Sequence, residues 1–148
     1  MDGCFAACGC DDYEGVTKAD LDRFTDKIEN VLNDEKGRRL FRNYMFTSKM
    51  KDGRRTLDFW EHTDKLIGYQ ENAESISYRS YLRRVDRLID EAGRIEELDF
   101  ATMERLTIAR DSEIKEEIIE ALKVLKTEAT KALRREYAKF QMRFIPSK

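Results

Sequence analysis

Few side chains in this sequence could act as nucleophiles or bind a metal ion. The three cysteines, Cys4, Cys8 and Cys10, all lie within the first ten residues, and His62 is the single histidine. An odd number of cysteines in an intracellular chain argues against a disulfide framework. A structural zinc site needs four ligands, and three cysteines with one distant histidine match the usual ligand spacings poorly. We therefore expect no disulfide framework and no metal site.

The same cysteines suit a different chemistry, which is S-acylation. Cys4, Phe5 and Cys8 place thiols beside an apolar side chain close to the N-terminus. Reversible acylation of cysteines near a terminus anchors proteins to membranes. The alternative is that Cys4, Cys8 and Cys10 are reduced and unmodified in a flexible tail. We keep lipidation of these three residues as a hypothesis.

Motifs that carry enzymatic chemistry are absent from the sequence. It has no P-loop, no Gly-rich dinucleotide turn after a strand, no metal-binding motif and no nucleophile elbow. One histidine and no cysteine beyond Cys10 leave few general bases. The many carboxylates alternate with Lys and Arg at helical spacing, which is typical of surface ion pairs. We expect no catalytic residues, no cofactor and no active site of its own.

Charge and hydropathy narrow the class of partner and the location. The 28 basic and 30 acidic residues leave a net charge of −2, which is not the balance of a nucleic-acid-binding domain. No run of apolar residues is long enough to span a bilayer. The N-terminus also lacks the basic and then apolar order of a secretory signal. We expect a cytoplasmic protein, peripheral at the inner face of the plasma membrane if the cysteines are acylated.

The apolar spacing predicts helices along most of the chain. The only proline is Pro146, and few segments alternate strictly between apolar and polar residues, so we expect no strand. We expect an all-α fold of roughly eight helices, preceded by a flexible Cys-containing tail over residues 1–15 and forming one domain over residues 16–148. The expected helices cover residues 18–33 with a Thr17–Asp20 start, the Leu40–Met45 region, the Leu57 region to about Gly68, Ser75–Ala92 as the longest, Phe100–Ala109 behind Asp99, and residues after Ser112. For the last segment, a break near Thr127 and one continuous helix to about Phe144 both remain open.

The central feature of the pattern is Leu57-Asp58-Phe59-Trp60, which contains the only tryptophan. A tryptophan among leucines mostly buries area, so we expect Trp60 in the core. The preceding segment, Lys49–Thr56, is rich in Lys and Arg and contains Gly53. We expect a basic loop there, and such a charge run is also typical of a plainly solvated loop.

The order of these segments resembles the RGS family, the regulators of G-protein signalling. The family shows a Leu-rich opening helix, an acidic-x-Gly-x-x-x-Phe-x-x-aromatic segment, a Leu/Ile-acidic-Phe-Trp element, a long aromatic-rich helix and a final Tyr-x-x-Phe. The spacing matches from Ile28 to Thr107 and needs a small insertion near residues 110–128. The matching segments here are Ile28–Leu32, Glu35–Tyr44, Leu57–Trp60, Tyr78–Leu82, Leu98–Asp99 with Thr102 and Glu104, and Tyr137–Phe140.

The resemblance implies a fold, a partner and a mechanism. It implies an RGS-like bundle that binds the switch regions of a heterotrimeric G-protein α subunit and holds them in the arrangement of the transition state for GTP hydrolysis. No catalytic arginine is inserted, and three loops at one end of the bundle make the contact. The residues it assigns to partner binding are Arg54, Arg55, Thr56, Glu97, Arg135 and Lys139. The residues it assigns to the core are Phe41, Phe59, Trp60, Tyr137 and Phe140.

Several expected contact residues depart from the pattern of activating family members. Those members have an asparagine four residues before the tryptophan and an acidic residue just before it, where this chain has Thr56 and Arg55. A second asparagine is replaced by Glu97, and an acidic residue two positions before the tyrosine is replaced by Arg135. Only Lys139 agrees with the pattern, which has a basic residue just before the phenylalanine of its final Tyr-x-x-Phe. The core therefore matches the family more closely than the contact residues do.

Three hypotheses follow from the sequence. The first is an RGS protein that activates the GTPase of an α subunit through atypical contacts. The second is an RGS-homology scaffold without activating function that binds another signalling protein. The third is an unrelated helical bundle that acts at an anionic membrane surface through Lys49, Lys51, Arg54 and Arg55. No nucleic-acid partner is expected under any of them.

Overall fold

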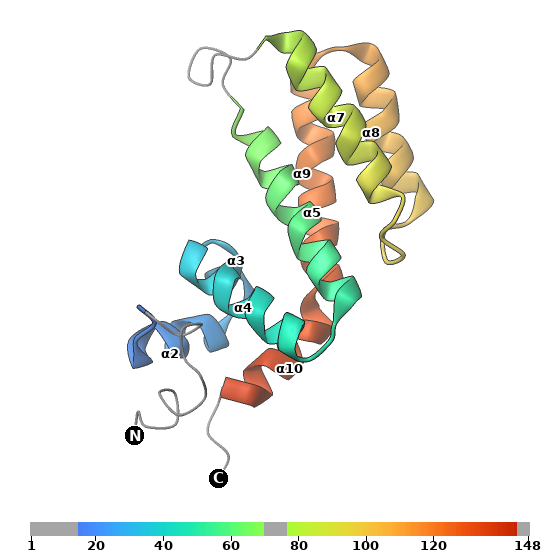
Figure 1. Ribbon diagram of the computed structural model, residues 1–148. Helices are drawn as coiled ribbons and strands as arrows, with labels where there is room; N and C mark the ends of the chain where they lie inside the picture. The colour runs from blue at the N-terminus through green and yellow to red at the C-terminus, as the bar shows by residue number, and fades with distance from the viewer. Residues whose placement is uncertain (1–14, 70–76, 145–148) are drawn as a thin grey trace. The chain divides into compact units, whose positions relative to one another are not determined.

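The protein is helical throughout the part of the chain that a computed structural model describes, residues 15–69 and 77–144 (Figure 1). No strand occurs in these residues, so the expected all-α class is confirmed. Cys4, Cys8 and Cys10 lie outside the described residues, and their lipidation stays a prediction. The eight described helices are α2 (Lys18–Asp26), α3 (Ile28–Leu32), α4 (Glu35–Thr47), α5 (Lys51–Ile67), α7 (Tyr78–Ala92), α8 (Phe100–Ser112), α9 (Lys115–Ala132) and α10 (Arg134–Phe144).

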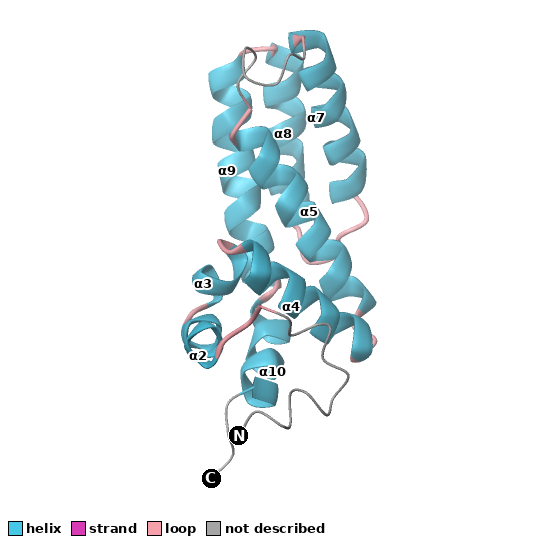
Figure 2. Ribbon diagram, turned by 60° about the vertical axis from the view of Figure 1, so that its left-hand side comes forward, coloured by secondary structure: helices cyan, strands magenta, loops and turns pink. Residues whose placement is uncertain are grey.

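The chain divides into two compact units. The terminal unit consists of Met1–Arg54 together with Arg134–Lys148, and it holds α2, α3, α4, α10 and the start of α5. The central unit is Arg55–Leu133, in which α5, α7, α8 and α9 run side by side (Figure 2). The two ends of the sequence therefore contribute helices to the same unit.

The expected helix over residues 18–33 is interrupted, and a single helix was the wrong prediction. Its start is confirmed, because Thr17 and Asp20 exchange side-chain to backbone hydrogen bonds of 3.0 Å in a capping box. At Lys27 the backbone is extended, with φ −143° and ψ 144°, and α3 begins at the next residue. The Asn30 side chain donates to the Arg23 carbonyl at 2.9 Å. The Arg23 carbonyl lies in the last turn of α2, where carbonyl groups have no partner within the helix. The bond from Asn30 supplies one and so reduces the free-energy cost of the break.

Gly37 lies inside α4 and not in the connecting turn. Asp34 caps this helix, accepting from the backbone N–H groups of Lys36 at 2.8 Å and Gly37 at 3.2 Å. A Cβ atom on Gly37 would lie 2.7 Å from the Val31 carbonyl oxygen and 3.0 Å from its Cα. The absence of a side chain therefore lets α4 approach the backbone of α3.

The predicted basic loop over Lys49–Thr56 is wrong, because most of it is the first part of α5. Only a short turn ending at Met50 separates α4 from α5, and Lys49 adopts a left-handed conformation in it, with φ 60°. Lys and Arg are good helix formers, so a basic run by itself does not indicate a loop. Gly53 is buried in this helix, and a Cβ there would lie 2.6 Å from Met45 Sδ and 2.8 Å from Glu136 Cγ.

Aromatic side chains from α4 and α10 form the core of the terminal unit. The Phe41 ring meets the Phe140 ring at a centroid distance of 5.1 Å and the Tyr137 ring at 6.2 Å, both edge to face. The Tyr137 hydroxyl donates to the Phe24 carbonyl at 2.7 Å. Burial raises the pKa of Tyr137 to about 12. All three of Phe41, Tyr137 and Phe140 are buried, as expected.

The core of the central unit is built around α5. Phe59 and Trp60 are buried, which confirms the remaining two expected core residues. On α7 the buried face includes Tyr81, Leu82 and Val85, but α7 is not the longest helix, since α9 has 18 residues. On α8 the large apolar side chains of Phe100 and Ile108 are 72% and 63% exposed. Leu106 and Ala109 fill the core from α8 instead.

The break between the last two helices falls at Leu133. Neither a break near Thr127 nor one continuous helix is correct, because α9 runs to Ala132 and α10 begins at Arg134. Leu133 is buried, and its N–H donates to the carbonyls of Ala129 and Thr130. The expected cap at Asp99 is confirmed by its 2.7 Å bond from the Thr102 N–H, and Ser112 Oγ accepts from the Ile114 N–H at 3.1 Å.

Candidate functional site

The first turn of α5 lies against the first turn of α10 in the terminal unit. Gly53 and Glu136 mark the closest approach, since any side chain on Gly53 would collide with Glu136 Cγ. Their neighbours in sequence are Arg54 on α5 and Arg134 and Arg135 on α10. The structure therefore brings the basic residue at the start of α5 close to the two basic residues at the start of α10. We call this surface the α5–α10 basic face.

Arg54 is held in place by an aromatic side chain. Its guanidinium carbon lies 4.9 Å from the centroid of the Phe46 ring, within the range of a cation–π contact. The Nε atom of Arg54 is buried and has no hydrogen-bond partner within the described chain. The side chain is half-buried, so Arg54 contributes a positioned positive charge and not a freely moving one.

Two acidic residues partly neutralise the positive charge of the α5–α10 basic face. Arg134 lies 3.6 Å from Glu29, and Arg135 lies 3.6 Å from Glu136, measured between side-chain nitrogen and oxygen. Glu136 is buried, and its Oε1 atom has no hydrogen-bond partner within the described chain. Arg135 and Lys139 are both exposed on α10. The face is therefore mixed in charge.

The other predicted contact residues belong to the central unit. Arg55 and Glu97 are exposed, Glu97 in the connection between α7 and α8. Thr56 is only 3% exposed, because the segment is helical and this position turns toward the core. A sequence interpretation that placed Thr56 in a loop could not anticipate this. The position that carries an asparagine in activating RGS members is thus occupied here by a buried side chain.

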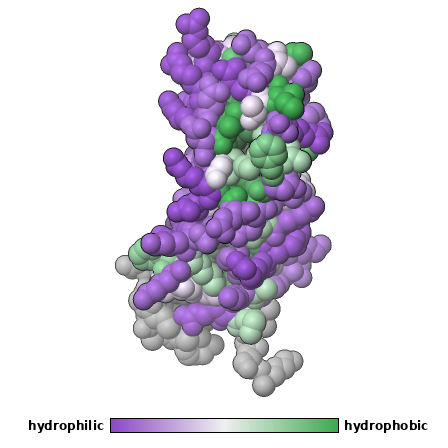
Figure 3. Space-filling view, turned by 90° about the vertical axis from the view of Figure 1, so that its right-hand side faces the viewer, coloured by the Kyte–Doolittle hydropathy of each residue, from purple (hydrophilic) through white to green (hydrophobic). Residues whose placement is uncertain are grey.

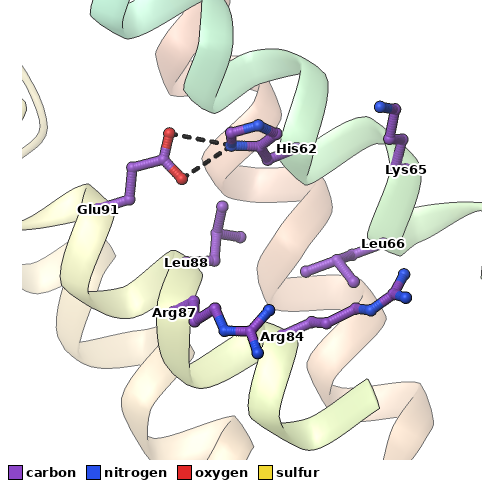
Figure 4. A pocket seen from close by; sticks show the side chains of 7 residues that line it. All are labelled: His62, Lys65, Leu66, Arg84, Arg87, Leu88 and Glu91. Atoms are coloured by element: carbon purple, nitrogen blue, oxygen red, sulfur yellow. Dashed lines mark hydrogen bonds and ion pairs between the residues drawn. The ribbon is translucent and has the colours of Figure 1, made fainter. Parts of the chain in front are cut away.

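The central unit also contains a groove between α5 and α7 that sequence reasoning missed. Its volume is about 310 Å³, and Figure 4 shows the side chains that surround it. The imidazole Nδ1 of His62 lies 2.9 Å and 3.0 Å from the two carboxylate oxygens of Glu91 at one end. Arg84 and Arg87 lie one turn apart on α7, but that spacing is equally typical of a solvated helix face, so the sequence does not indicate a groove. The lining residues are His62, Lys65, Leu66, Arg84, Arg87, Leu88 and Glu91.

The described residues contain neither a metal site nor a membrane-spanning helix. No group of His, Cys, Asp and Glu side chains in residues 15–69 and 77–144 could hold a metal ion. None of the described helices has the length and apolar character needed to cross a membrane. The surface in Figure 3 is mostly hydrophilic, with apolar areas exposed on the central unit.

No protein-family model matches this chain, and neither a curated protein nor a solved structure does. The resemblance to the RGS family therefore rests only on the sequence motifs quoted above.

Proposed function

We propose that this protein is an RGS-type regulator that binds the α subunit of a heterotrimeric G protein at its switch regions and stimulates GTP hydrolysis weakly. The supporting observation is the aromatic cluster of the terminal unit. Phe41 belongs to one of the motifs that resemble the family, and Tyr137 and Phe140 belong to another near the opposite end of the chain. These rings pack together at centroid distances of 5.1 to 6.2 Å. Packing in one core is a structural reason for the motif of Phe41 and the motif of Tyr137 and Phe140 to occur in the same sequence.

The mechanism needs no active site on this protein. An α subunit supplies its own groups to orient the attacking water and to stabilise the developing charge. A partner that reduces the freedom of the switch segments lowers the entropy cost of reaching the transition state. In the central unit the exposed side chains that would touch those segments are Arg55 and Glu97, and in the terminal unit the exposed candidates are Arg135 and Lys139. This protein would then be an activator and not an enzyme.

The activation should be weak for two physical reasons. A buried threonine cannot donate and accept hydrogen bonds with the reach of an exposed carboxamide, and Thr56 is such a residue. Arg55 and Arg135 also present positive charge where activating members present negative charge. A partner surface that attracts the acidic residues of activating members would repel Arg55 and Arg135. Such like-charge contacts slow association and weaken the complex.

A second candidate is an RGS-homology scaffold that binds another signalling protein without activating a GTPase. The observation that favours it is the burial of Thr56 together with the exposure of Arg135 on the α5–α10 basic face. A partner with an acidic surface would suit that face. The two candidates differ in one respect, which is whether GTP hydrolysis is accelerated.

Single-turnover hydrolysis of GTP by preloaded α subunits tests the proposal. The full chain should raise the hydrolysis rate modestly, and the variant Arg55→Glu/Arg135→Asp should raise it further. The matched control is Arg83→Glu/Arg143→Asp, which makes the same charge change at exposed arginines of α7 and α10. The control should behave like the unmodified chain. If neither the chain nor the first variant changes the rate for any α subunit, activation is excluded and the scaffold becomes the better account.

A further inference from the structure

The groove between α5 and α7 gathers positive charges that have no internal partner. Lys65, Arg84 and Arg87 are exposed, and none of them pairs with a carboxylate in residues 15–69 or 77–144. Some other cations of the central unit are paired, for example Arg110 with Asp86 at 2.7 Å and Lys126 with Asp64 at 2.7 Å. The groove therefore places three cations that have no carboxylate partner in the described residues around one concave surface.

The single carboxylate of the groove is already engaged. Both oxygens of Glu91 lie within hydrogen-bond distance of His62 Nδ1, and Figure 4 shows this pair at one end of the groove. It leaves Lys65, Arg84 and Arg87 without a neutralising neighbour among the lining residues. The groove is thus polarised along its length, with its net positive charge away from Glu91.

The groove also has an apolar floor. Leu66 from α5 and Leu88 from α7 line it, and the Arg84 side chain extends toward Leu66 (Figure 4). Long basic side chains offer their aliphatic stems as additional apolar surface while their charged ends stay in water. A ligand suited to this surface would combine negative charge with one apolar group.

The length of the groove limits what can occupy it. The lining residues of α7 run from Arg84 to Glu91, which is about 10 Å of helix at 1.5 Å per residue. About three extended residues cover that distance at roughly 3.3 Å each. We propose that this groove is a second binding site, one that takes a short acidic peptide segment with a single apolar anchor side chain. It uses none of the residues assigned to the α subunit and does not depend on that assignment.

Acidic residues that adjoin the lining residues in sequence favour a peptide over an anionic membrane. Asp90 precedes Glu91 and is exposed, and Glu61 precedes His62 and is half-exposed. A flat anionic bilayer would face these carboxylates together with the arginines, and like charges would repel. A peptide can place its carboxylates on Arg84, Arg87 and Lys65 alone. Its apolar side chain would then rest on Leu66 and Leu88.

Fluorescence anisotropy with the full chain tests the proposal. The probe is a fluorescein-labelled peptide, Glu-Asp-Leu-Glu-Asp, with two relatives in which the leucine becomes serine or all four acids become amides. Saturable binding of the probe is expected, weaker binding of the serine form, and no binding of the amide form. Backbone amide resonances of Leu66, Leu88 and Glu91 should shift on titration with the probe.

A matched pair of variants locates the site. Arg84→Gln/Arg87→Gln should weaken probe binding by about tenfold, because two charge-assisted contacts are lost. Arg79→Gln/Arg83→Gln removes the same charge from exposed positions of the same helix outside the groove, and should leave binding within about twofold. All four positions are exposed, so both variants should keep the melting temperature of the parent chain.

Three results would overturn the proposal. The first is no saturable binding of the probe at millimolar peptide. The second is an equal loss of binding in both double variants, which would indicate unspecific attraction between charges. The third is binding to phosphatidylserine vesicles that depends on Arg84 and Arg87 while the peptide does not bind, which would assign the groove to a membrane surface.

Discussion

The indole Nε1 of Trp60 donates a hydrogen bond to Thr130 Oγ1 at 3.1 Å and so joins α5 to α9. The ammonium group of Lys126 lies 5.0 Å from the centroid of the Trp60 ring and pairs with Asp64 at 2.7 Å. The indole is 2% exposed, and its one polar atom has a partner. The only tryptophan of the chain therefore fixes the register between two helices as well as filling the core of the central unit.

Replacement of Trp60 should destabilise the protein strongly. Trp60→Ala leaves a large cavity, and the free energy of unfolding should fall by about 3–5 kcal/mol. Thr130→Val keeps most of the side-chain shape but leaves the indole N–H unsatisfied, and should cost about 1–3 kcal/mol. Urea unfolding followed by circular dichroism measures both. An unchanged midpoint for Trp60→Ala would mean that the indole is not a core group in solution.

Gly37 and Gly68 should respond oppositely to alanine. Alanine is the better helix former by about 1 kcal/mol, so helix propensity alone favours the change. At Gly37 a Cβ would meet backbone atoms of Val31 at 2.7 and 3.0 Å, which cannot move aside without shifting α3. We expect Gly37→Ala to lose about 1–3 kcal/mol. At Gly68 the nearest atoms lie 3.8 Å away, so Gly68→Ala should be neutral or stabilising. Equal midpoints for the two variants in urea would contradict the close approach of α3 and α4.

Alkaline pH should destabilise the protein through its buried tyrosines. Burial raises the pKa of Tyr137 to about 12, and burial also raises the pKa of Tyr81 well above its usual value. The unfolded chain loses these protons near pH 10, whereas the folded chain keeps them. Stability present below pH 10 is therefore lost as the pH rises toward 12.

Tyr137→Phe isolates the contribution of one of these groups. The variant removes the hydroxyl that donates to the Phe24 carbonyl, so its stability at neutral pH should be lower. Its stability should also fall less steeply between pH 10 and pH 12, because one titrating group is missing. Urea midpoints measured across that range provide the comparison. A slope identical to that of the parent would show that Tyr137 ionises equally in the folded and unfolded chain.

Membrane attachment, if it occurs, should need two signals. A single acyl chain holds a protein only marginally, and basic side chains near an anionic leaflet add about 1 kcal/mol each. We therefore expect both Cys4/Cys8/Cys10→Ser and Arg54/Arg55/Arg134/Arg135→Glu to move the protein from the membrane fraction to the cytosol. Cell fractionation compares these variants with the intact chain. If all three stay equally in the cytosolic fraction, the membrane interpretation is wrong.

Local chemistry explains what could be predicted from the sequence. Thr17 with Asp20, and Asp99 with Thr102, are caps whose partners lie within a few residues, and both were found as expected. The buried Trp60 followed from its size and its apolar neighbours. These features depend on residues that are close together in the chain, so one sequence is enough to predict them.

Features that depend on distant contacts were missed. The break at Lys27 is supported by Asn30, whose amide reaches back to Arg23 across the turn. The helical start of α5 packs Gly53 against Glu136, a residue of the last helix. The burial of Thr56 follows from that helix. The groove exists because α7 places Arg84 and Arg87 beside Lys65 of α5. None of these relationships leaves a periodic trace in the sequence.

The central claim is that this protein recognises a G-protein α subunit in its transition-state arrangement. The most direct measurement is retention of the full chain on immobilised α subunits loaded with GDP, with and without aluminium fluoride. The proposed function predicts measurable retention by at least one α subunit only when aluminium fluoride is present. No retention in either state by any α subunit, or equal retention in both, would contradict it.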